Sequence, residues 1–378
     1  MTTAFRSDQS TAERVRAELA PVRRLAIVRA LALGDLLVAT PALRALRAGY
    51  PQAEITLIGL PWAAGLAARL DRWIDRFVVF PGWPGIAEAP YDPARTRRFL
   101  VEQRAYGYDL VIQMHGNGGA SNPFALALGG RHTAGYTPDY APGYSLGYAL
   151  DGARAGLSRA APYPDDQPEV MRDLALAELV GCPPQGTRLE FPIMGADVAE
   201  ADRLLAPLAG ERGPLIGLHA GARAASRRWS PRSFAKVADE LTRRHGARII
   251  LTGGPDERAI VAQVERAMRA PALNLAGQTS LGGLAALLAR LDLLITSDSG
   301  PGHLAEAVGA PTVRIFGPAD VRRWGPLPSE RHVVVRVDVA CSPCGYQDCP
   351  IDHRCLRRVT PALALEAAER LLMKGASA

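Results

Sequence analysis

Short apolar runs alternate with longer amphipathic stretches along most of the chain. In the first half, this pattern predicts strands over 25–29, 54–58, 76–80 and 109–114 and helices over 36–48, 63–70, 96–106 and 169–180. In the second half, it predicts strands over 214–219, 247–252, 272–275, 293–295 and 311–316 and helices over 197–208, 231–245, 256–269, 281–291 and 302–308. Strands that alternate with helices indicate an α/β protein with parallel, doubly wound sheets.

The alternation is interrupted twice near the middle of the chain. A stretch rich in Pro, Gly and Tyr over 137–168 predicts surface loops with short strands. A second interruption, over 181–194, is interpreted as an interdomain linker. A chain of 378 residues is long enough for two domains of ordinary size. We therefore expect two Rossmann-like domains, over 1–190 and 191–378, that face a cleft where a ligand binds.

The N-terminal region shows neither a signal peptide nor a membrane span. The first ten residues have no apolar core, and no apolar stretch reaches about 18 residues without interruption. The segment over 11–20 predicts a short helix with Ala12, Val15 and Leu19 on one side. That side could rest on a bilayer, but we favour packing on the protein. We therefore expect a cytoplasmic protein, with the cytoplasmic face of the inner membrane as a peripheral contact.

Composition adds a weak preference for acidic partners. The chain is 48% hydrophobic and 22% charged, as is ordinary for a soluble globular protein. Its 44 Lys and Arg against 38 Asp and Glu give a net charge of +6, and nearly all the basic residues are Arg. Guanidinium groups suit phosphate and carboxylate. Such an excess fits an acidic substrate or an anionic membrane, and it is also common in Arg-rich proteins that have neither partner.

The most informative turn lies within 293–318. An apolar strand leads into Thr296 to Pro301, which starts a helix that Gly309 ends. Ligands sit at the carboxyl ends of parallel strands, and helix starts bind anions such as phosphate. His303, in the first turn of the helix, can reach the same anion. Alternatively, Asp298 or Ser299 only caps the helix and His303 only faces solvent.

Asp35 follows the first predicted strand, at the edge expected to face the cleft. Its carboxylate can cap the next helix by accepting backbone N–H bonds, or it can act as a general base. Gly116 to Gly119 follows another strand and is either a seat for an acceptor group or a plain loop. The first half lacks G-x-G-x-x-G and the chain lacks G-x-x-x-x-G-K-[ST], which disfavours a dinucleotide-dependent dehydrogenase and a P-loop kinase.

Several ordered motifs resemble glycosyltransferase family 9, the ADP-heptose:lipopolysaccharide heptosyltransferases. The string Asp298 to His303, followed by a G-A-P-T strand and Phe316-Gly317-Pro318, resembles the donor-binding motif of that family. Residues 34–43, GDLLVATPAL, match a family pattern whose Asp takes the proton of the acceptor hydroxyl. This match favours Asp35 as the base. The resemblance spans about residues 25–60 and 214–320 and is weaker between them.

Further turns in the second half resemble the donor site of the family. His219 to Ala222 resembles its H-P-G-A turn with Ala in place of Pro, and Arg227 to Pro231 resembles its K-R-W-P segment. Thr252 to Glu257 resembles the turn beside the nucleoside, where Glu257 would hold ribose hydroxyls. Residues 274–281 resemble the N-L-x-G-x-T-S-L segment, where backbone near Thr279 would meet adenine. The resemblance thus implies donor-binding roles for His219, Gly221, Arg227, Arg228, Thr252, Gly253, Glu257, Thr279, Asp298, Ser299, Gly300 and His303.

The basic pair Arg227-Arg228 departs from the family pattern. The phosphate-contacting Lys of the family falls on Arg227, and Arg keeps the charge but changes the geometry of the contact. Without the resemblance, a solvated basic turn would explain the pair equally well.

Four cysteines lie within fifteen residues, namely Cys341, Cys344, Cys349 and Cys355, while Cys182 stands alone. In a cytosolic chain such a cluster suggests Zn or Fe more than disulfides, with His353 as a further potential ligand. Similar cysteine-rich tails occur in family 9, and a subgroup that glycosylates autotransporters holds iron in such a cluster. The spacing differs from a standard zinc ribbon. Two interpretations stay open, a structural Zn or Fe site and reduced cysteines, and neither has a catalytic role.

The resemblance implies a GT-B architecture and an inverting, metal-independent glycosyltransferase that needs no cofactor. It would move a heptose or related sugar from ADP-heptose to the lipopolysaccharide core, or to another glycan or lipid-linked acceptor. Asp35 would accept the proton, and Arg227, Arg228 and the start of the 302–308 helix would stabilise the leaving diphosphate. No nucleic-acid partner is expected.

Two alternatives to this enzyme stay open. A nucleotide-sugar 2-epimerase of similar fold would turn over UDP-sugar without an acceptor. A non-catalytic nucleotide-binding scaffold is disfavoured by the joint presence of Asp35, Arg227 and Asp298. The residues alone do not distinguish ADP-heptose from other nucleotide sugars, and they do not define the acceptor or the oligomeric state.

Overall fold

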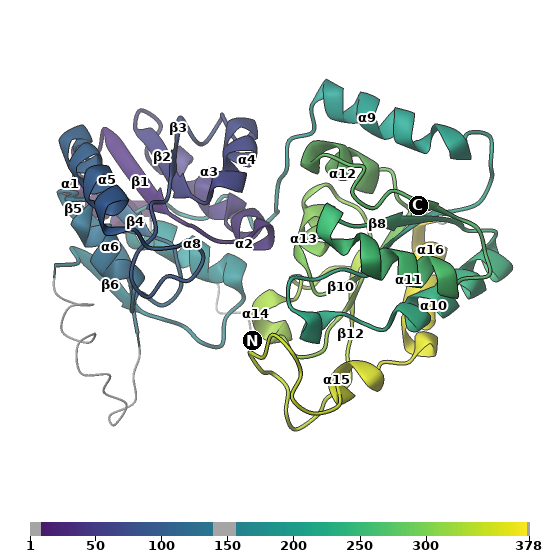
Figure 1. The fold of residues 1–378 in the computed structure, drawn as a ribbon. Helices are drawn as coiled ribbons and strands as arrows, with labels where there is room; N and C mark the ends of the chain where they lie inside the picture. The colour runs from purple at the N-terminus through teal and green to yellow at the C-terminus, as the bar shows by residue number, and fades with distance from the viewer. Residues whose placement is uncertain (1–8, 139–155, 376–378) are drawn as a thin grey trace. The chain divides into compact units, whose positions relative to one another are not determined.

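A computed structural model describes residues 9–138 and 156–375 (Figure 1). These residues form two compact units, and the chain passes from the first to the second between Arg188 and Leu189, inside the stretch interpreted as a linker. Each unit contains one parallel sheet of six strands with helices packed against it. The α/β class with two Rossmann-like domains is therefore confirmed.

The first unit contains a sheet in the order β3-β2-β1-β4-β5-β6, in which every neighbouring pair is parallel. Its elements are α1 (Gln9–Leu19), β1 (Arg24–Val28), α2 (Leu33–Val38), α3 (Thr40–Gly49), β2 (Glu54–Gly59), the 3-10 turn η1 (Pro61–Ala63), α4 (Ala64–Arg69), β3 (Arg76–Val79), α5 (Pro93–Tyr106), β4 (Leu110–Gln113), α6 (Ser121–Ala127), β5 (His132–Thr137), β6 (Arg159–Pro162) and α8 (Glu169–Leu179).

The second unit contains a sheet in the order β12-β11-β10-β7-β8-β9, again with every neighbouring pair parallel. Its elements are α9 (Gly195–Leu205), η2 (Ala206–Leu208), β7 (Leu215–His219), η3 (Ala225–Arg227), α10 (Pro231–His245), β8 (Arg248–Thr252), η4 (Pro255–Glu257), α11 (Arg258–Ala267), β9 (Ala272–Asn274), α12 (Leu281–Leu288), β10 (Leu293–Ser297), α13 (Gly300–Ala307), β11 (Thr312–Ile315), α14 (Val321–Trp324), β12 (His332–Val335), α15 (Arg354–Arg357) and α16 (Pro361–Gly375).

The two sheets have the same strand order. Counted within its own unit, each sheet runs third, second, first, fourth, fifth, sixth, which is the order of a doubly wound nucleotide-binding fold. In each unit the chain therefore changes direction between its first and fourth strands. This switch point lies between β1 and β4 in the first unit and between β7 and β10 in the second.

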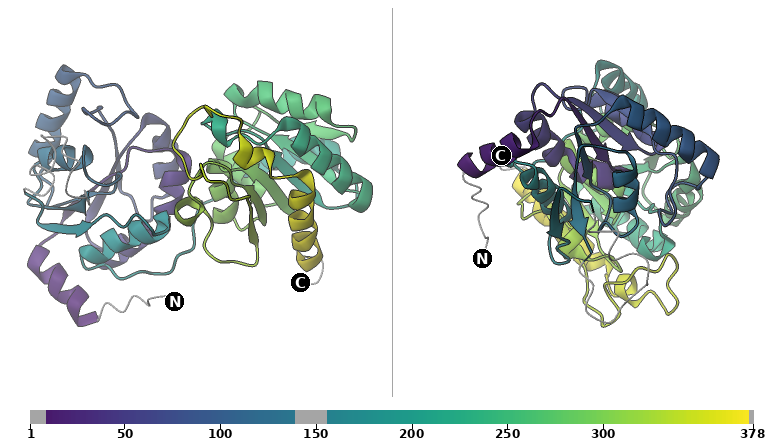
Figure 2. Two further views of the ribbon diagram at one scale, coloured as in Figure 1. Left: turned by 90° about the horizontal axis from the view of Figure 1, so that it is seen from below. Right: turned by 90° about the vertical axis from the view of Figure 1, so that its left-hand side faces the viewer.

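Helices cover the central strands, which explains why those strands are almost wholly apolar. In the first unit, Ala26 and Val28 of β1 pack in a cluster with Phe99 of α5 and Phe124 of α6. In the second unit, β7, β10 and β11 contribute to a larger cluster that includes residues of α10, α11 and α16. Figure 2 shows α16 beside the second sheet, and it also contacts α10. A strand that is covered on both faces has no polar side to alternate with.

Several predicted elements differ from those observed. The helix predicted over 36–48 is two helices, α2 and α3, separated at Ala39. Pro41 explains the break, because proline has no N–H to bond the carbonyl of Leu37, four residues earlier, and the Thr40 hydroxyl donates to that carbonyl at 2.7 Å instead. The alternation pattern also missed α6, β5, β12 and α16. Part of the stretch expected to form loops, residues 139–155, lies outside the described residues.

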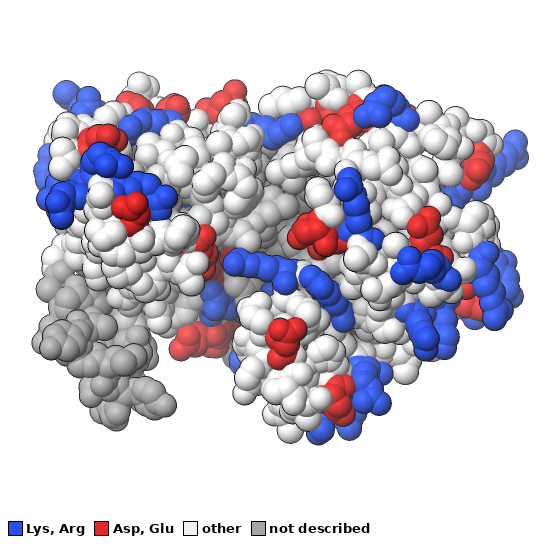
Figure 3. Space-filling model, viewed as in Figure 1, with Lys and Arg blue, Asp and Glu red and all other residues white. Residues whose placement is uncertain are grey.

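The helix predicted over 11–20 is α1, and its apolar side is buried against the protein. Ala12, Val15 and Leu19 are all buried, as expected for packing on the protein. Among the described residues, no helix is both long enough and apolar enough to cross a membrane. On the face shown in Figure 3, basic and acidic side chains are interspersed, so the net charge does not gather there in a single basic patch.

Candidate active site

The structure brings most of the predicted donor-binding residues to the carboxyl edge of the second sheet. The chain leaves β7 toward β8 and leaves β10 toward β11, and at such a divergence between neighbouring parallel strands open α/β sheets place their ligands. His219 ends β7, Thr252 ends β8, and Asp298 directly follows β10. These are the positions at which open α/β sheets bind ligands.

His219, Thr252 and Glu257 form a polar chain across two loops. The His219 Nδ1 atom lies 3.1 Å from Thr252 Oγ1, and its Nε2 atom lies 3.5 Å from Glu257 Oε2. Glu257 Oε2 also accepts the backbone N–H of Gly254 at 2.8 Å. Burial lowers the pKa of His219 more than the carboxylate of Glu257 raises it, so the imidazole is neutral. This chain fixes the direction of the Glu257 carboxylate.

Gly221 leaves room for that carboxylate. A Cβ atom at residue 221 would lie 1.9 Å from Glu257 Oε1, which is far inside contact distance. Gly253 is similarly confined, because a Cβ there would lie 2.9 Å from a methyl group of Val261. The two glycines therefore let the loops after β7 and β8 approach each other around Glu257.

Arg227 pairs with a buried carboxylate. Its NH1 atom lies 3.2 Å from Asp298 Oδ2, and the side chains are 39% and 5% exposed, respectively. The neighbouring Arg228 donates from Nε to the carbonyl of Ala222 at 2.8 Å, which ties it to the loop after β7. The basic pair is therefore not a freely solvated turn. Arg227 keeps an exposed portion beside the end of β10, where its guanidinium can meet an anion.

The start of α13 faces the same region. Ser299 is the N-cap residue, but its hydroxyl accepts no capping bond and instead donates to Ser297 O at 3.2 Å. The helix begins at Gly300, two residues before the predicted start, and Gly309 follows its end with a positive φ, as the sequence predicted. Hence Ser299 does not simply cap the helix, and the positive end of the α13 dipole lies at the turn.

His303 is buried, which contradicts the alternative that it faces solvent. It is 6% exposed, and its Nδ1 atom lies 3.4 Å from NH1 of Arg314. Burial and then the charge of Arg314 lower the pKa of His303 well below its usual value. Without a bound anion the ring of His303 is therefore neutral.

The sequence analysis missed Arg314, which organises this helix. It lies on β11 and is 2% exposed. Its NH2 atom donates to Gly302 O at 2.5 Å and to Glu306 Oε2 at 2.6 Å. The sequence did contain a sign of this role, because Arg314 is the one charged residue in the apolar strand Thr312–Ile315. A charge in a buried strand requires partners of opposite charge or hydrogen-bond acceptors.

The loop that contains Thr279 lies beside the turn after β8. Gly277 N donates to Gly253 O at 2.7 Å, which joins the two loops. Ser280 caps α12 by accepting the N–H of Gly283 at 2.9 Å. Thr279 itself is half-buried between these two fixed points. Its backbone is therefore held close to the Thr252 to Glu257 turn.

Asp35 lies in the first unit, beyond the end of β1. It is the third residue of α2, and its Oδ2 accepts the N–H of Ala32 at 3.0 Å. Asp35 thus makes the backbone bond expected of a capping carboxylate. This bond does not exclude the base, because a half-buried carboxylate has acceptor positions beyond one backbone bond.

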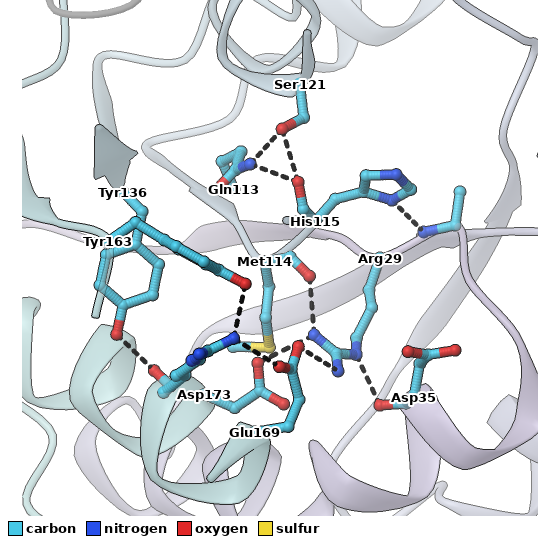
Figure 4. Close-up of polar contacts among 12 residues, drawn as sticks. Arg29, Asp35, Gln113, Met114, His115, Ser121, Tyr136, Tyr163, Glu169 and Asp173 are labelled. Carbon is cyan, nitrogen blue, oxygen red and sulfur yellow. Dashed lines mark hydrogen bonds and ion pairs between the residues drawn. The ribbon is translucent and has the colours of Figure 1, made fainter. Parts of the chain in front are cut away.

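A buried cluster of four charged residues supports the loop of Asp35 (Figure 4). Arg29 is 2% exposed and donates from Nε to the Asp35 carbonyl at 2.7 Å. Its NH1 atom bonds Asp173 Oδ1 at 2.8 Å, and its NH2 atom lies 3.9 Å from Glu169 Oε1. Arg172 completes the cluster by bonding Glu169 at 3.2 Å. At the switch point of the first sheet, two guanidinium groups thus pair with two carboxyl groups, and burial raises the pKa of Asp173 well above its usual value because it outweighs the charge of Arg29.

The sequence analysis did not identify this cluster. One signal was the arginine directly after the apolar run Leu25–Val28. The other was the spacing of Glu169, Arg172 and Asp173, which places all three on one face of a helix. Asp173 lies 144 residues after Arg29 along the chain. Only folding brings these residues together.

His115 follows β4 at the other side of the same switch point. Its Nδ1 atom accepts the N–H of Ala30 at 3.3 Å, and its Nε2 atom lies 3.8 Å from Glu88 Oε2. Burial lowers the pKa of His115 to about 4. The Gly-rich turn that begins at Gly116 therefore starts beside a neutral imidazole.

A sequence profile of glycosyltransferase family 9 (heptosyltransferase) matches residues 96–354. The chain belongs to glycosyltransferase family 9. The family 9 relatives include lipooligosaccharide heptosyltransferase 2 of Campylobacter jejuni, which is 33% identical over 162 residues, or 42% of this chain and 51% of the relative. That alignment spans about half the length of the relative. Lipopolysaccharide heptosyltransferase 2 of Escherichia coli is 26% identical over 357 residues, or 90% of this chain and 96% of the relative.

The fold of this family 9 chain is similar to that of solved family structures. The structure of E. coli ADP-heptose lps heptosyltransferase II superposes with a TM-score of 0.70 at 22% identity, covering 93% of this chain and 99% of that chain. The similarity confirms the GT-B fold class predicted from the resemblance.

The four clustered cysteines of the family 9 chain lie in a segment over 341–355, here called the cysteine segment. All four line one pocket, and they and Cys182 are free thiols. Within residues 9–138 and 156–375, no three His, Cys, Asp or Glu side chains lie close enough to hold a metal ion. The thiols as placed do not form a metal site, so no chemical step is assigned to a metal there.

Proposed function

We propose that this chain is an inverting glycosyltransferase that transfers heptose from ADP-heptose to the core of lipopolysaccharide. Family membership supports sugar transfer. Relatives named for heptose transfer to lipooligosaccharide or lipopolysaccharide support the sugar and the acceptor, and the solved structure named for ADP-heptose supports the nucleotide. These same similarities favour the transferase over a nucleotide-sugar 2-epimerase or a non-catalytic scaffold.

The observation that carries this proposal is the pairing of Arg227 with Asp298 at the end of β10, beside the start of α13. An inverting transfer leaves a nucleoside diphosphate, on which negative charge increases as the glycosidic bond breaks. A partly exposed guanidinium and a helix dipole supply positive potential where that charge forms. The buried Asp298 orients Arg227, and we assign it the hydroxyl groups of the donor sugar.

The nucleoside is assigned to the adjacent loops. Glu257, fixed by His219 and Gly254, offers a carboxylate for ribose hydroxyls. The loop around Thr279 lies against this turn and offers backbone groups to the base. Gly221 and Gly253 keep space for the carboxylate. We therefore assign the donor to the second unit, residues 191–378, and the acceptor to the first, residues 1–190.

Asp35 is assigned as the general base. As the acceptor oxygen forms its bond to the anomeric carbon, the bond from that carbon to the diphosphate breaks, and the hydroxyl proton passes to Asp35. The bond from Arg29 to the Asp35 carbonyl and the bond from Ala32 to its carboxylate hold the base in place. This chemistry is proposed to need no divalent metal. A location at the cytoplasmic face of the inner membrane stays a prediction.

A structural Zn or Fe bound by Cys341, Cys344, Cys349 and Cys355 also stays a prediction of the sequence. The shared pocket supports it, although the side chains would have to converge on the ion. Elemental analysis of the protein purified without chelator tests it. About one Zn or Fe per chain, lost when the four cysteines are replaced by serine, is the expected result. A metal-free chain that keeps its thermal stability would support reduced cysteines.

Calorimetric titration with ADP, UDP and GDP tests the donor assignment. Selective binding of ADP, lost in Arg227→Ala, is the expected outcome, and release of ADP from ADP-heptose only when a lipopolysaccharide core acceptor is added would establish transfer. A preference for UDP or GDP would exclude the ADP-heptose assignment. Turnover of UDP-sugar without an acceptor would instead indicate an epimerase.

A further inference from the structure

The loop that carries Arg227 is fixed on its C-terminal side by Trp229. This residue is 1% exposed and packs edge to face on Phe234, with ring centroids 5.0 Å apart. Its indole N–H donates to Val359 O at 2.9 Å, and its backbone N–H donates to Ser297 Oγ at 3.2 Å. This side of the loop is therefore anchored in the hydrophobic core of the second unit.

The N-terminal side of the loop is fixed by Ser226, and its partners lie about 120 residues further along the chain. Ser226 is 2% exposed. Its hydroxyl donates to Tyr346 O at 2.6 Å, and its backbone N–H donates to Gln347 O at 2.9 Å. Both acceptors belong to the cysteine segment, and Ser226 lines the same pocket as the four cysteines.

The cysteine segment is itself attached to the sheet. Ser342 Oγ donates to Gly317 O at 2.7 Å, and Cys344 N donates to Pro318 O at 2.7 Å. These bonds join the segment to the loop after β11. The segment therefore connects a fixed loop at the sheet edge to the loop that presents Arg227.

We propose that Ser226 is a positioning residue for the donor diphosphate, which it serves by holding the Arg227 loop against the cysteine segment. This inference rests on the proposed function, because it takes Arg227 as a ligand of the diphosphate. Arg227 has one buried partner, Asp298, and is otherwise partly exposed, so its position depends on the backbone that bears it. A loop that must be ordered when the ligand binds costs affinity, whereas a loop that is already held does not.

The test is calorimetric titration of the full-length protein with ADP and with adenosine, which lacks the diphosphate. Ser226→Ala removes the bond to Tyr346 O, and we expect it to weaken ADP binding about five- to tenfold. Adenosine binding should change less than about twofold, because the nucleoside contacts lie on other loops. The matched control is Thr242→Ala, which removes a hydroxyl-to-carbonyl bond of 3.0 Å at the end of α10, in the same unit but away from both the cysteine segment and the Arg227 loop. It should leave ADP affinity within about twofold.

Dependence on Arg227 separates positioning from general stability. If Ser226 acts through Arg227, the double variant Ser226→Ala/Arg227→Ala should bind ADP no more weakly than Arg227→Ala. Equal losses for ADP and adenosine, additive losses in the double variant, or unchanged ADP affinity in Ser226→Ala would each overturn the inference. Should Ser226→Ala fail to fold, Ser226→Cys replaces it in the same titrations. Its thiol has a similar size but is only a weak donor, so the same selective loss of ADP affinity is expected. Absence of all nucleotide binding in the unmodified protein would instead overturn the proposed function, and the inference with it.

Discussion

Asp35 and Glu257, in different units, are oriented by the same kind of local hydrogen bond. Each carboxylate accepts the backbone N–H of the residue three positions earlier, Ala32 in one case and Gly254 in the other. Each does so just beyond the end of a strand of a parallel sheet. A carboxylate has about four acceptor positions, so one backbone bond can orient the side chain while others meet a substrate.

Replacing Asp35 by Asn should separate these two tasks. The amide oxygen of Asn can still accept the Ala32 N–H, so the fold and the affinity for ADP should be unchanged. The amide cannot take a proton, and turnover should fall by about 10²-fold or more. Initial rates of ADP release, compared with the thermal unfolding midpoint and the Kd of ADP, measure the difference. Normal turnover would leave Asp35 with the capping role alone.

Replacing Gly221 by Ala should damage the donor site with little effect elsewhere. The new Cβ would meet Glu257 Oε1 at 1.9 Å, so the carboxylate must leave its bonds to His219 and Gly254. We expect ADP to bind at least about tenfold more weakly, equivalent to ~1.4 kcal/mol, by calorimetry.

Gly195→Ala is the matched control for this change. Gly195 begins α9, and an added Cβ would meet no atom within 4 Å. This variant should bind ADP normally. A normal ADP affinity in Gly221→Ala would show that the position of Glu257 does not matter for the donor.

Among the elements, the ends of the central strands decide where charge is buried. β1 ends next to Arg29, and His115 lies two residues beyond the end of β4. Both side chains are buried, the first within an ion cluster and the second as a neutral ring. The strands themselves are apolar, so these polar ends must find partners on loops and on α8.

The neutral state of His115 predicts a loss of stability in acid. Burial lowers its folded-state pKa to about 4 from an ordinary 6.5. Below pH 6.5 the unfolded chain takes up a proton that the folded site refuses, so the free energy of unfolding falls as pH falls toward 4. Above pH 6.5 this residue makes no contribution to the pH dependence. The loss is on the order of 3 kcal/mol when complete.

Urea unfolding at pH 7.5, 6.5, 5.5 and 4.5 measures this dependence. The variant His115→Gln cannot titrate in this range, and its free energy of unfolding should fall less steeply between pH 6.5 and 4.5 than that of the unmodified protein. Parallel slopes for the two proteins would show that His115 is not the titrating group.

The two units of the whole molecule repeat one topology but differ in what they place at the switch point. The first unit places the buried cluster of Arg29, Glu169, Arg172 and Asp173 there, together with Asp35. The second unit places Arg227, Asp298 and the polar chain from Thr252 to Glu257. Each unit has a hydrophobic cluster of its own. A division of labour between donor and acceptor is the simplest use of this difference.

The fragment over 189–378 should therefore fold alone and bind ADP. It contains every residue assigned to the donor and the whole core cluster of the second unit. We expect cooperative thermal unfolding and a Kd for ADP within about tenfold of that of the full chain. A folded fragment that does not bind ADP would place part of the donor site in the first unit. A fragment that aggregates would show that the second unit depends on the first.

The local pattern alone determined the class of fold and the location of the turns. Buried strands such as β7 and β10 are continuous apolar runs, and the Gly, Pro, Ser and Asp residues after them mark strand ends. The spacing of the motifs placed His219, Arg227, Glu257 and Asp298 on turns that share one sheet edge. These features follow from hydrophobic periodicity and turn chemistry, which act over a few residues.

Tertiary structure decided which of these residues are charged, buried or held. His303 is neutral because the fold buries it and, secondly, places it against Arg314. The loop of Asp35 is supported because α8 carries Asp173, which pairs with Arg29. The Arg227 loop is held because residues 346 and 347 return to Ser226. Burial, pKa and pairing depend on neighbours that are 11 to about 140 residues away along the chain. A local sequence pattern extends over a few residues, so it cannot predict which distant residues become neighbours in the folded chain.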